Sequence, residues 1–242
     1  MKLICYLSNG YPTISASETI AGYYATAGCD VIEIDLPARN PFLENDLIKS
    51  RMAEALKECD DYDKYMDNIR VIKRKYPNIK VLMVVYESTV KEIGVEKFTG
   101  FCLSNDIKDI IYVGLENEVI KNQMIQKGIQ ISCYVQFNML EKEIESAKAS
   151  NGFVYMQAVA APGKINPKFP TLADCIKHLR NQGIDRPIYC GVGVSTPTDF
   201  KMVKDAKGDG AFVGSTILKL YNNPEALVET IKAFKAEDEE DN

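Results

Sequence analysis

One acidic residue near the start of this 242-residue chain, Glu33, has the surroundings expected of a proton-transfer group. Glu33 lies within the apolar run Val31 to Leu36, and Glu44 lies in the loop that follows. In a parallel sheet covered by helices, neither face of a strand meets bulk water, so a carboxylate there is costly unless it is paired or used. We therefore predict a catalytic role for Glu33, with a hydrogen bond to an inward Arg or to a hydroxyl such as that of Tyr155 as the alternative. From its position alone, Glu44 is expected to be a solvated loop acid or a residue near the N-cap of the helix that contains Leu47 to Leu56.

Two glycine-containing turns have the composition of an anion site. Gly191 to Ser195 follows the seventh apolar run, and Gly214-Ser215 follows the eighth, at the start of a short helix expected over Ser215 to Tyr221. Glycine lets backbone N–H groups approach an oxygen closely, and the start of a helix carries partial positive charge. Together the turns predict a phosphate site, whereas the alternative is that their glycines only permit tight turns.

Eight apolar runs alternate with segments of helical periodicity. The strands are expected at Leu3 to Leu7, Val31 to Leu36, Val81 to Tyr86, Ile110 to Val113, Ile129 to Tyr134, Phe153 to Gln157, Pro187 to Cys190 and Ala211 to Val213. The helices between and after them are expected at Ile14 to Ala27, Leu47 to Leu56, Tyr62 to Tyr76, Val95 to Ser104, Val119 to Lys127, Leu140 to Ser150, Leu172 to Gln182 and Thr198 to Asp205. This order predicts a single α/β domain, a (β/α)8 TIM barrel over residues 1–236, with a doubly wound sheet as the alternative. The acidic run from Glu237 predicts a solvated tail over residues 237–242.

The composition narrows the class of partner. A net charge of -5 and a pI near 5.2 give no basic surface for nucleic acid or anionic lipid, so a small-molecule ligand is expected. The seven cysteines are an odd number without paired spacing, which is typical of reduced thiols in a cytoplasmic protein. We expect no membrane span. With one histidine, His178, and no clustered ligands, we expect no metal site and no cofactor.

Six segments, in order along the chain, resemble the tryptophan synthase alpha subunit family. They are YLSNGYP from Tyr6, AGCDVIEIDLP from Ala27, GVEKF from Gly94, GFVYM from Gly152, CGVGVSTP from Cys190 and VGSTILK from Val213. The resemblance implies a TIM-barrel lyase that cleaves indole-3-glycerol phosphate to indole and glyceraldehyde 3-phosphate, with a tryptophan synthase beta subunit as partner. It implies that Glu33 is the general acid/base and that Glu44, where the family has an aspartate, stabilises the indole ring in the transition state. It places Tyr6 and Tyr155 beside the substrate, and the phosphate at Gly163, Gly193, Val194, Gly214 and Ser215.

The chain departs from the family pattern mainly on the substrate side. Asp35, which shares the strand face of Glu33 by alternation, replaces a glycine, and Arg39 and Asn40 replace Ser-Asp in the loop that contacts the beta subunit. Val159 to Lys164 replaces the loop whose threonine closes over the catalytic aspartate, and Gly114 replaces an aspartate. These changes predict a more polar pocket bearing Asp35, Arg39 and Asn40. They leave open an aldolase or isomerase acting on another phosphorylated small molecule, or a non-catalytic phosphate-ligand binder.

Overall fold

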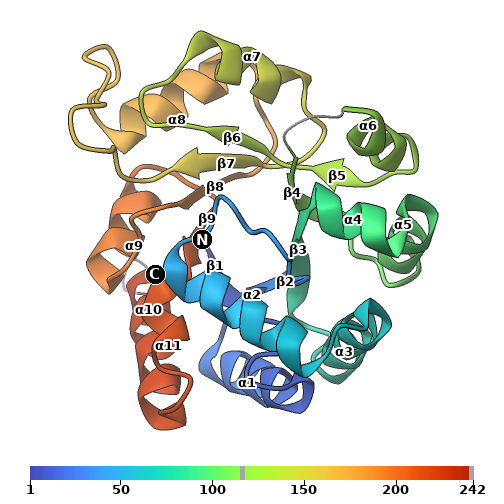
Figure 1. The fold of residues 1–242 in the computed structure, drawn as a ribbon. Helices are drawn as coiled ribbons and strands as arrows, with labels where there is room; N and C mark the ends of the chain where they lie inside the picture. Colours follow the sequence, from blue (N-terminus) through green and yellow to red (C-terminus); the bar gives the residue numbers. More distant parts are fainter. Residues whose placement is uncertain (115–117, 240–242) are drawn as a thin grey trace.

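The strands form a parallel ring surrounded by helices, as the computed structural model of residues 1–114 and 118–239 shows (Figure 1). The strand order is β5-β4-β3-β2-β1-β9-β8-β7-β6. The bounds are β1 (Lys2–Leu7), β2 (Val31–Asp35), β3 (Lys80–Tyr86), β4 (Asp109–Val113), β5 (Gln130–Ile131), β6 (Cys133–Val135), β7 (Val154–Gln157), β8 (Ile188–Gly191) and β9 (Gly210–Val213). The TIM-barrel prediction is confirmed, and the doubly wound alternative is wrong.

The ring is completed by one segment that the sequence predicts as a single strand. β5 and β6 are separated only by Ser132, whose N–H donates to the carbonyl of Ile110 ahead of the point where the segment changes partner. The next N–H, of Cys133, donates to the carbonyl of Phe153. β5 therefore pairs with β4 and β6 pairs with β7, which brings the two ends of the sheet together.

Most of the helices cover the outside of the ring. They are α1 (Ile14–Ala27), α2 (Asp46–Glu58), α3 (Tyr62–Lys75), α4 (Glu87–Ile93), α5 (Val95–Ser104), α6 (Glu118–Gln126), α7 (Glu141–Ala149), α8 (Leu172–Asn181), α9 (Pro197–Asp205), α10 (Ser215–Leu218) and α11 (Pro224–Glu239). The predicted helices agree within two residues at each end, except that α10 ends at Leu218. Helix α4 was not predicted, because it begins directly after β3 without a turn. Helix α11 was not predicted either, although Leu227, Ile231 and Phe234 are buried there at helical spacing.

One cluster of side chains fills the interior of the barrel. Ile4, Val31, Leu82, Phe153 and Phe212 form it, and Ile111, Tyr155 and Tyr189 pack against it. These side chains come from strands all around the ring, so they can meet only inside it. Since Val31 points inward, alternation along β2 directs Glu33 and Asp35 inward as well, nearer the carboxyl end of the strand.

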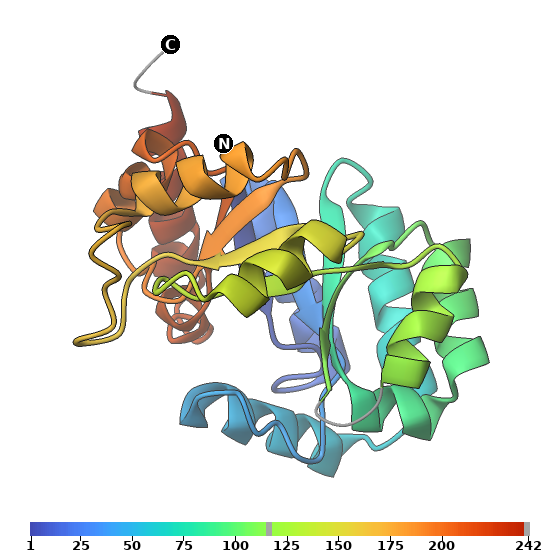
Figure 2. The ribbon, with the colours of Figure 1, turned by 90° about the horizontal axis from the view of Figure 1, so that it is seen from above.

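Helix α2 lies across the end of the barrel toward which the carboxyl ends of the strands point. Figure 1 shows it in front of the ring, and Figure 2, turned by 90°, shows it beyond the strand ends. The loop that carries Glu44 leads directly into this helix. Active sites of such barrels lie at this end, so α2 brings the Glu44 loop to the proposed site.

The C-terminal helix extends into the segment expected to be a tail. Glu237 and Asp238 belong to α11, and the carboxylate of Asp238 accepts a hydrogen bond from the N-terminal ammonium at 2.7 Å. Residues 240–242 lie outside the described residues, so a domain boundary at residue 237 stays a prediction. Within the described chain, no helix combines the length and apolar character needed to cross a bilayer.

Candidate active site

Glu33 is a buried acid without a hydrogen-bond donor. It pairs in register with Tyr6 of β1 and Leu82 of β3, and the residue is 7% exposed. No described residue donates a hydrogen bond to its carboxylate, so the alternative of a pairing with Tyr155 or an inward Arg is wrong. Burial raises the pKa of Glu33 well above its ordinary value, and the charges of Glu44 and Asp35 raise it further. The raised pKa favours the protonated form of this carboxyl group, which is the form that can donate a proton to a substrate.

Asp35, two residues further along β2, is fixed by two hydrogen bonds. The hydroxyl of Tyr6 donates to Oδ2 at 2.7 Å, and the N–H of Asn9 donates to Oδ1 at 2.7 Å. Burial raises the pKa of Asp35 from 3.8 to about 7, against the lowering effect of both bonds and of the Arg51 charge. The carboxylate is thus held toward β1 and the loop that follows it, and its charge opposes ionisation of Glu33.

Glu44 is half-buried and bonded to a neighbouring strand end. The hydroxyl of Tyr86, the last residue of β3, donates to Oε1 at 3.2 Å. Burial raises the pKa of Glu44, and this bond opposes the rise. The N-cap of α2 is Asn45, whose side chain accepts from the N–H of Ile48, so Glu44 lies directly before the N-cap, as its position predicts, but does not itself cap the helix. Because its carboxylate is half-buried and bonded to Tyr86, Glu44 is not a freely solvated loop acid.

Arg39 lies outside this group of acids. Its guanidinium donates to the carboxylate of Glu92 near the end of α4, with Nη2 at 2.7 Å from Oε1, and both side chains are exposed. The expectation that Arg39 makes the substrate pocket more polar is therefore wrong. A sequence neighbour of a buried strand can point to either side of the loop, and here an acid on α4 attracts the guanidinium outward.

The two glycine turns after β8 and β9 lie side by side. The hydroxyl of Thr216 donates to the carbonyl of Ser195 at 3.0 Å and joins them. The backbone N–H groups of Gly193, Val194 and Ser215 donate to no described residue, so they are open to an anion. Gly193 adopts a φ of +103°, and a Cβ there would lie 2.6 Å from the side chain of Val159, so a larger residue does not fit.

The turns also border the acids of the barrel interior. A Cβ on Gly214 would lie 3.8 Å from Cβ of Tyr6, whose hydroxyl bonds to Asp35. The ring of Tyr155 packs against Phe212 with centroids 4.4 Å apart. The pKa of Tyr155 is raised mainly by burial and next by the charge of Glu33. The same ring fills the space where Gly191 would carry a Cβ, so at Gly191 the packing explanation is sufficient.

Gly163 is the predicted residue that stands apart. It lies in the exposed loop after β7, and no atom outside its chain neighbours is within 4 Å of its would-be Cβ. No hydrogen bond among the described residues joins it to Gly193 or Ser215. The structure thus brings together Tyr6, Glu33, Glu44, Tyr155 and the turns at Gly193-Val194 and Gly214-Ser215, and leaves Gly163 outside them. Sequence reasoning missed Tyr86 and Asn45, which contact this group from other elements.

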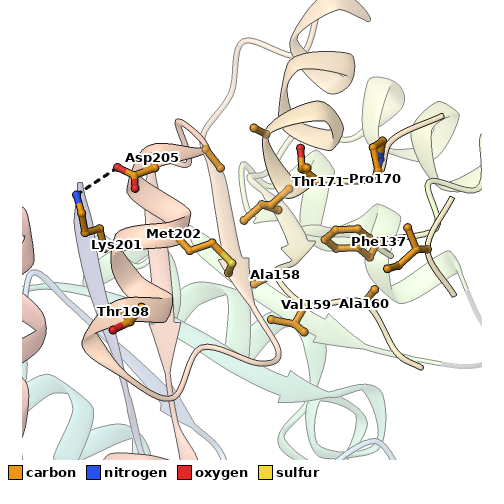
Figure 3. Close-up of a pocket in the computed structure, with 14 residues that line it drawn as sticks. Phe137, Ala158, Val159, Ala160, Pro170, Thr171, Thr198, Lys201, Met202 and Asp205 are labelled. Carbon is orange, nitrogen blue, oxygen red and sulfur yellow. Dashed lines mark hydrogen bonds and ion pairs between the residues drawn. The ribbon is translucent and has the colours of Figure 1, made fainter. Parts of the chain in front are cut away.

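A separate pocket of about 800 Å³ lies between α8, α9 and the loop after β7 (Figure 3). Its lining is largely apolar and includes Phe137, Leu172 and Met202. Val159 lines it and also borders Gly193, so this pocket and the glycine turns share a wall. None of the acids described above lines it. In the part of the chain that the structure describes, no group of three or more His, Cys, Asp or Glu is arranged to hold a metal ion.

Comparison with known proteins gives a single family. The family model described as "Tryptophan synthase alpha chain" matches residues 1–241. A tryptophan synthase alpha chain of Lachnospira eligens is 25% identical over 97% of this chain and 92% of its own length, and one of Synechocystis is 23% identical over 90% and 83%. The crystal structure of tryptophan synthase subunit alpha from Legionella pneumophila has the same fold, with a TM-score of 0.83, 19% identity and coverage of 98% of this chain and 92% of that one. The chain belongs to the tryptophan synthase alpha chain family.

Proposed function

We propose that this protein is a carbon–carbon lyase that cleaves indole-3-glycerol phosphate to indole and glyceraldehyde 3-phosphate, with Glu33 as the general acid/base. The observation that carries the proposal is the Glu33 carboxyl group, which is buried at the inner face of β2 and receives no hydrogen bond from any described residue. A buried acid without a partner is costly to the fold, and a task in proton transfer accounts for its presence.

The proposed reaction uses Glu33 for two proton transfers. Protonated Glu33 donates to C3 of the indole ring, and the resulting carboxylate takes the proton of the side-chain hydroxyl on the adjacent carbon. The bond between C3 and that carbon then breaks, its electron pair returns to the ring, and the carbon becomes the aldehyde. The raised pKa of Glu33 favours the protonated form with which the cycle begins, and the second transfer restores that form.

Two further groups support this reaction. While C3 is protonated the ring carries positive charge, and a carboxylate at Glu44 facing the ring N–H stabilises it. The hydrogen bond from Tyr86 favours the ionised form of Glu44 that this role needs. The phosphate is assigned to the open N–H groups of Gly193, Val194 and Ser215 and to the turn at Gly214, with Tyr6 and Tyr155 beside the substrate. Gly163 has the weakest support, since no contact joins it to these groups.

The direct test is to incubate the protein with indole-3-glycerol phosphate and measure released indole. Glu33→Gln is expected to reduce the rate by a factor of about 10² to 10⁴, the range for one acid/base group, and Glu44→Gln by about 10². Glu92→Gln, which removes an exposed acid paired with Arg39, is the control and is expected to turn over normally. Normal turnover in Glu33→Gln would remove the assignment.

One observation favours a second candidate, an aldolase or isomerase for another phosphorylated substrate. Asp35 places a second carboxylate, with a pKa of about 7, on the inward face of β2. Phosphate binding without indole release by the wild-type protein would support this candidate over the first.

We also propose a protein partner and a cellular location. Family membership supports a beta subunit as partner, and co-elution with one in size-exclusion chromatography tests it. A cytoplasmic location is proposed from the cysteine pattern, since all seven thiols are free and all but Cys59 are buried.

A further inference from the structure

The side chain of Asn45 joins two segments that hold different parts of the proposed site. Asn45 follows Glu44 directly, and its Oδ1 accepts from the N–H of Ile48 at 3.1 Å, which caps α2. Its Nδ2 donates to Oγ of Ser215 at 3.3 Å, in the turn assigned to phosphate. Because the Ile48 N–H can only donate, the amide oxygen of Asn45 must face it, and the NH₂ group must face Ser215.

This orientation makes the Ser215 hydroxyl an acceptor from Asn45 and leaves its hydrogen free to donate. A hydroxyl has one hydrogen to donate and two lone pairs to accept with. Asn45 occupies a lone pair, and Ser215 Oγ donates to no described residue, so its hydrogen is available to a phosphate oxygen. In a series of connected hydrogen bonds each bond polarises the next, so a phosphate bound to Ser215 strengthens the hydrogen bond from Asn45 to Ser215.

A second tie holds α2 in place independently of Asn45. The guanidinium of Arg51 donates from Nη2 to the carbonyl of Leu218, at the opposite end of α10 from Ser215. It lies 4.4 Å from the ring centroid of Tyr11 and 4.2 Å from that of Tyr221, and Arg51 is 6% exposed. The helix is therefore anchored whether or not phosphate is bound, and the variable contact is the one made by Asn45.

We propose that Asn45 is a positioning residue that couples phosphate binding to the order of the Glu44 loop. Phosphate bound by Ser215 strengthens the Asn45 bridge, and the bridge fixes the backbone next to Glu44. The inference rests on the proposed function, because it gives Asn45 a task in the same site. The ligand class is a phosphate monoester or free phosphate, recognised through the same oxygens.

The test uses the full chain and inorganic phosphate as the probe. Hydrogen exchange of the backbone amides is measured across residues 43–50 with and without phosphate, in the wild type and in Asn45→Ser. Serine retains an N-cap oxygen but has no NH₂ group to reach Ser215. Asn223→Ser is the matched control, since Asn223 Oδ1 accepts from the N–H of Ala226 at the start of α11, away from the site.

In the wild type and in Asn223→Ser, phosphate is expected to slow exchange across residues 43–50 several-fold. In Asn45→Ser the slowing is expected to vanish at saturating phosphate, and the Kd for phosphate to rise about two- to tenfold, the loss of one neutral hydrogen bond. Ser215→Ala removes the bridge and also the hydroxyl that donates to phosphate, so it is expected to lose the slowing and to raise the Kd for phosphate more than Asn45→Ser does. Adding Asn45→Ser to Ser215→Ala is expected to change little further, because the bridge is already absent.

Equal slowing in the wild type and Asn45→Ser would overturn the inference, and so would failure of the wild type to bind phosphate. Indole release, measured in parallel, separates this inference from the proposed function. Phosphate-dependent coupling without indole release leaves the inference standing and removes the lyase. Indole release without the coupling removes the inference and leaves the lyase, and with the coupling a raised KM in Asn45→Ser at little change in kcat supports both.

Discussion

Replacing Asp35 by asparagine should change how the stability of this protein depends on pH. Asp35 is 1% exposed, and its pKa in the folded protein is about 7, whereas an unfolded aspartate has the ordinary value near 3.8. The folded state therefore binds the proton more tightly than the unfolded state. Stability contributed by this group is fully present below about pH 4, is lost as the pH rises toward 7, and stays lost at higher pH.

The size of the loss follows from the two pKa values. Each pKa unit corresponds to about 1.36 kcal/mol, so the ionised Asp35 costs the folded state roughly 4 kcal/mol above pH 7. The asparagine of the variant has no such cost. Its oxygen accepts from the N–H of Asn9, and its NH₂ group can donate to the Tyr6 oxygen. Replacing the bond from Tyr6 in this way costs the folded state about 1 kcal/mol, and this cost does not vary with pH.

The assay is urea unfolding of wild type and Asp35→Asn from pH 4.5 to pH 8, followed by circular dichroism because the chain contains no tryptophan. We expect the difference in free energy of unfolding, variant minus wild type, to increase by about 3–4 kcal/mol between pH 4.5 and pH 8. The Asp35 charge also raises the pKa of Glu33, so its removal adds a change of the same sign. A difference that stays constant with pH, or a wild type that gains on the variant as the pH rises, would refute the reasoning.

Two other predictions concern the remaining contacts of the site. Tyr86→Phe removes the hydroxyl that donates to Glu44, so the pKa of Glu44 should rise further. The acid limb of the pH profile for indole release should then move to higher pH, and the rate should fall roughly tenfold or more. An unchanged profile would contradict the assigned role of Glu44. Gly193→Ala combines a left-handed φ with a contact of 2.6 Å to Val159, so it should lower the free energy of unfolding by about 1–3 kcal/mol and weaken phosphate binding. Gly163 also has a left-handed φ, but nothing lies within 4 Å of its would-be Cβ, so Gly163→Ala should lower the free energy of unfolding only by the backbone strain and should bind phosphate normally. Equal phosphate affinity in the two variants would argue against phosphate binding at the glycine turns.

Much of the fold follows from local patterns. Apolar runs of strand length and helical spacing in the intervening segments place most elements within two residues of their observed ends, because both periods are properties of the backbone itself. The helix α4 was missed because it begins at the end of β3 with no turn residue to mark it. The division of the predicted fifth strand into β5 and β6 depends on how the two ends of the sheet meet, which no local pattern records.

The order of residues along β2 was enough to predict that Glu33 faces the same way as Val31 and Asp35, since side-chain direction along a strand alternates with every residue. The partners of these side chains, in contrast, follow from the folded barrel: Glu33 lacks a donor, Asp35 is bonded to Tyr6 and Asn9, and Arg39 turns outward to Glu92. In the same way Tyr86 meets Glu44, and Asn45 meets Ser215, 170 residues further along the chain. These contacts join separate elements at the end of the barrel, so they depend on how the strands close and on where α2 lies, and spacing along the chain does not encode either.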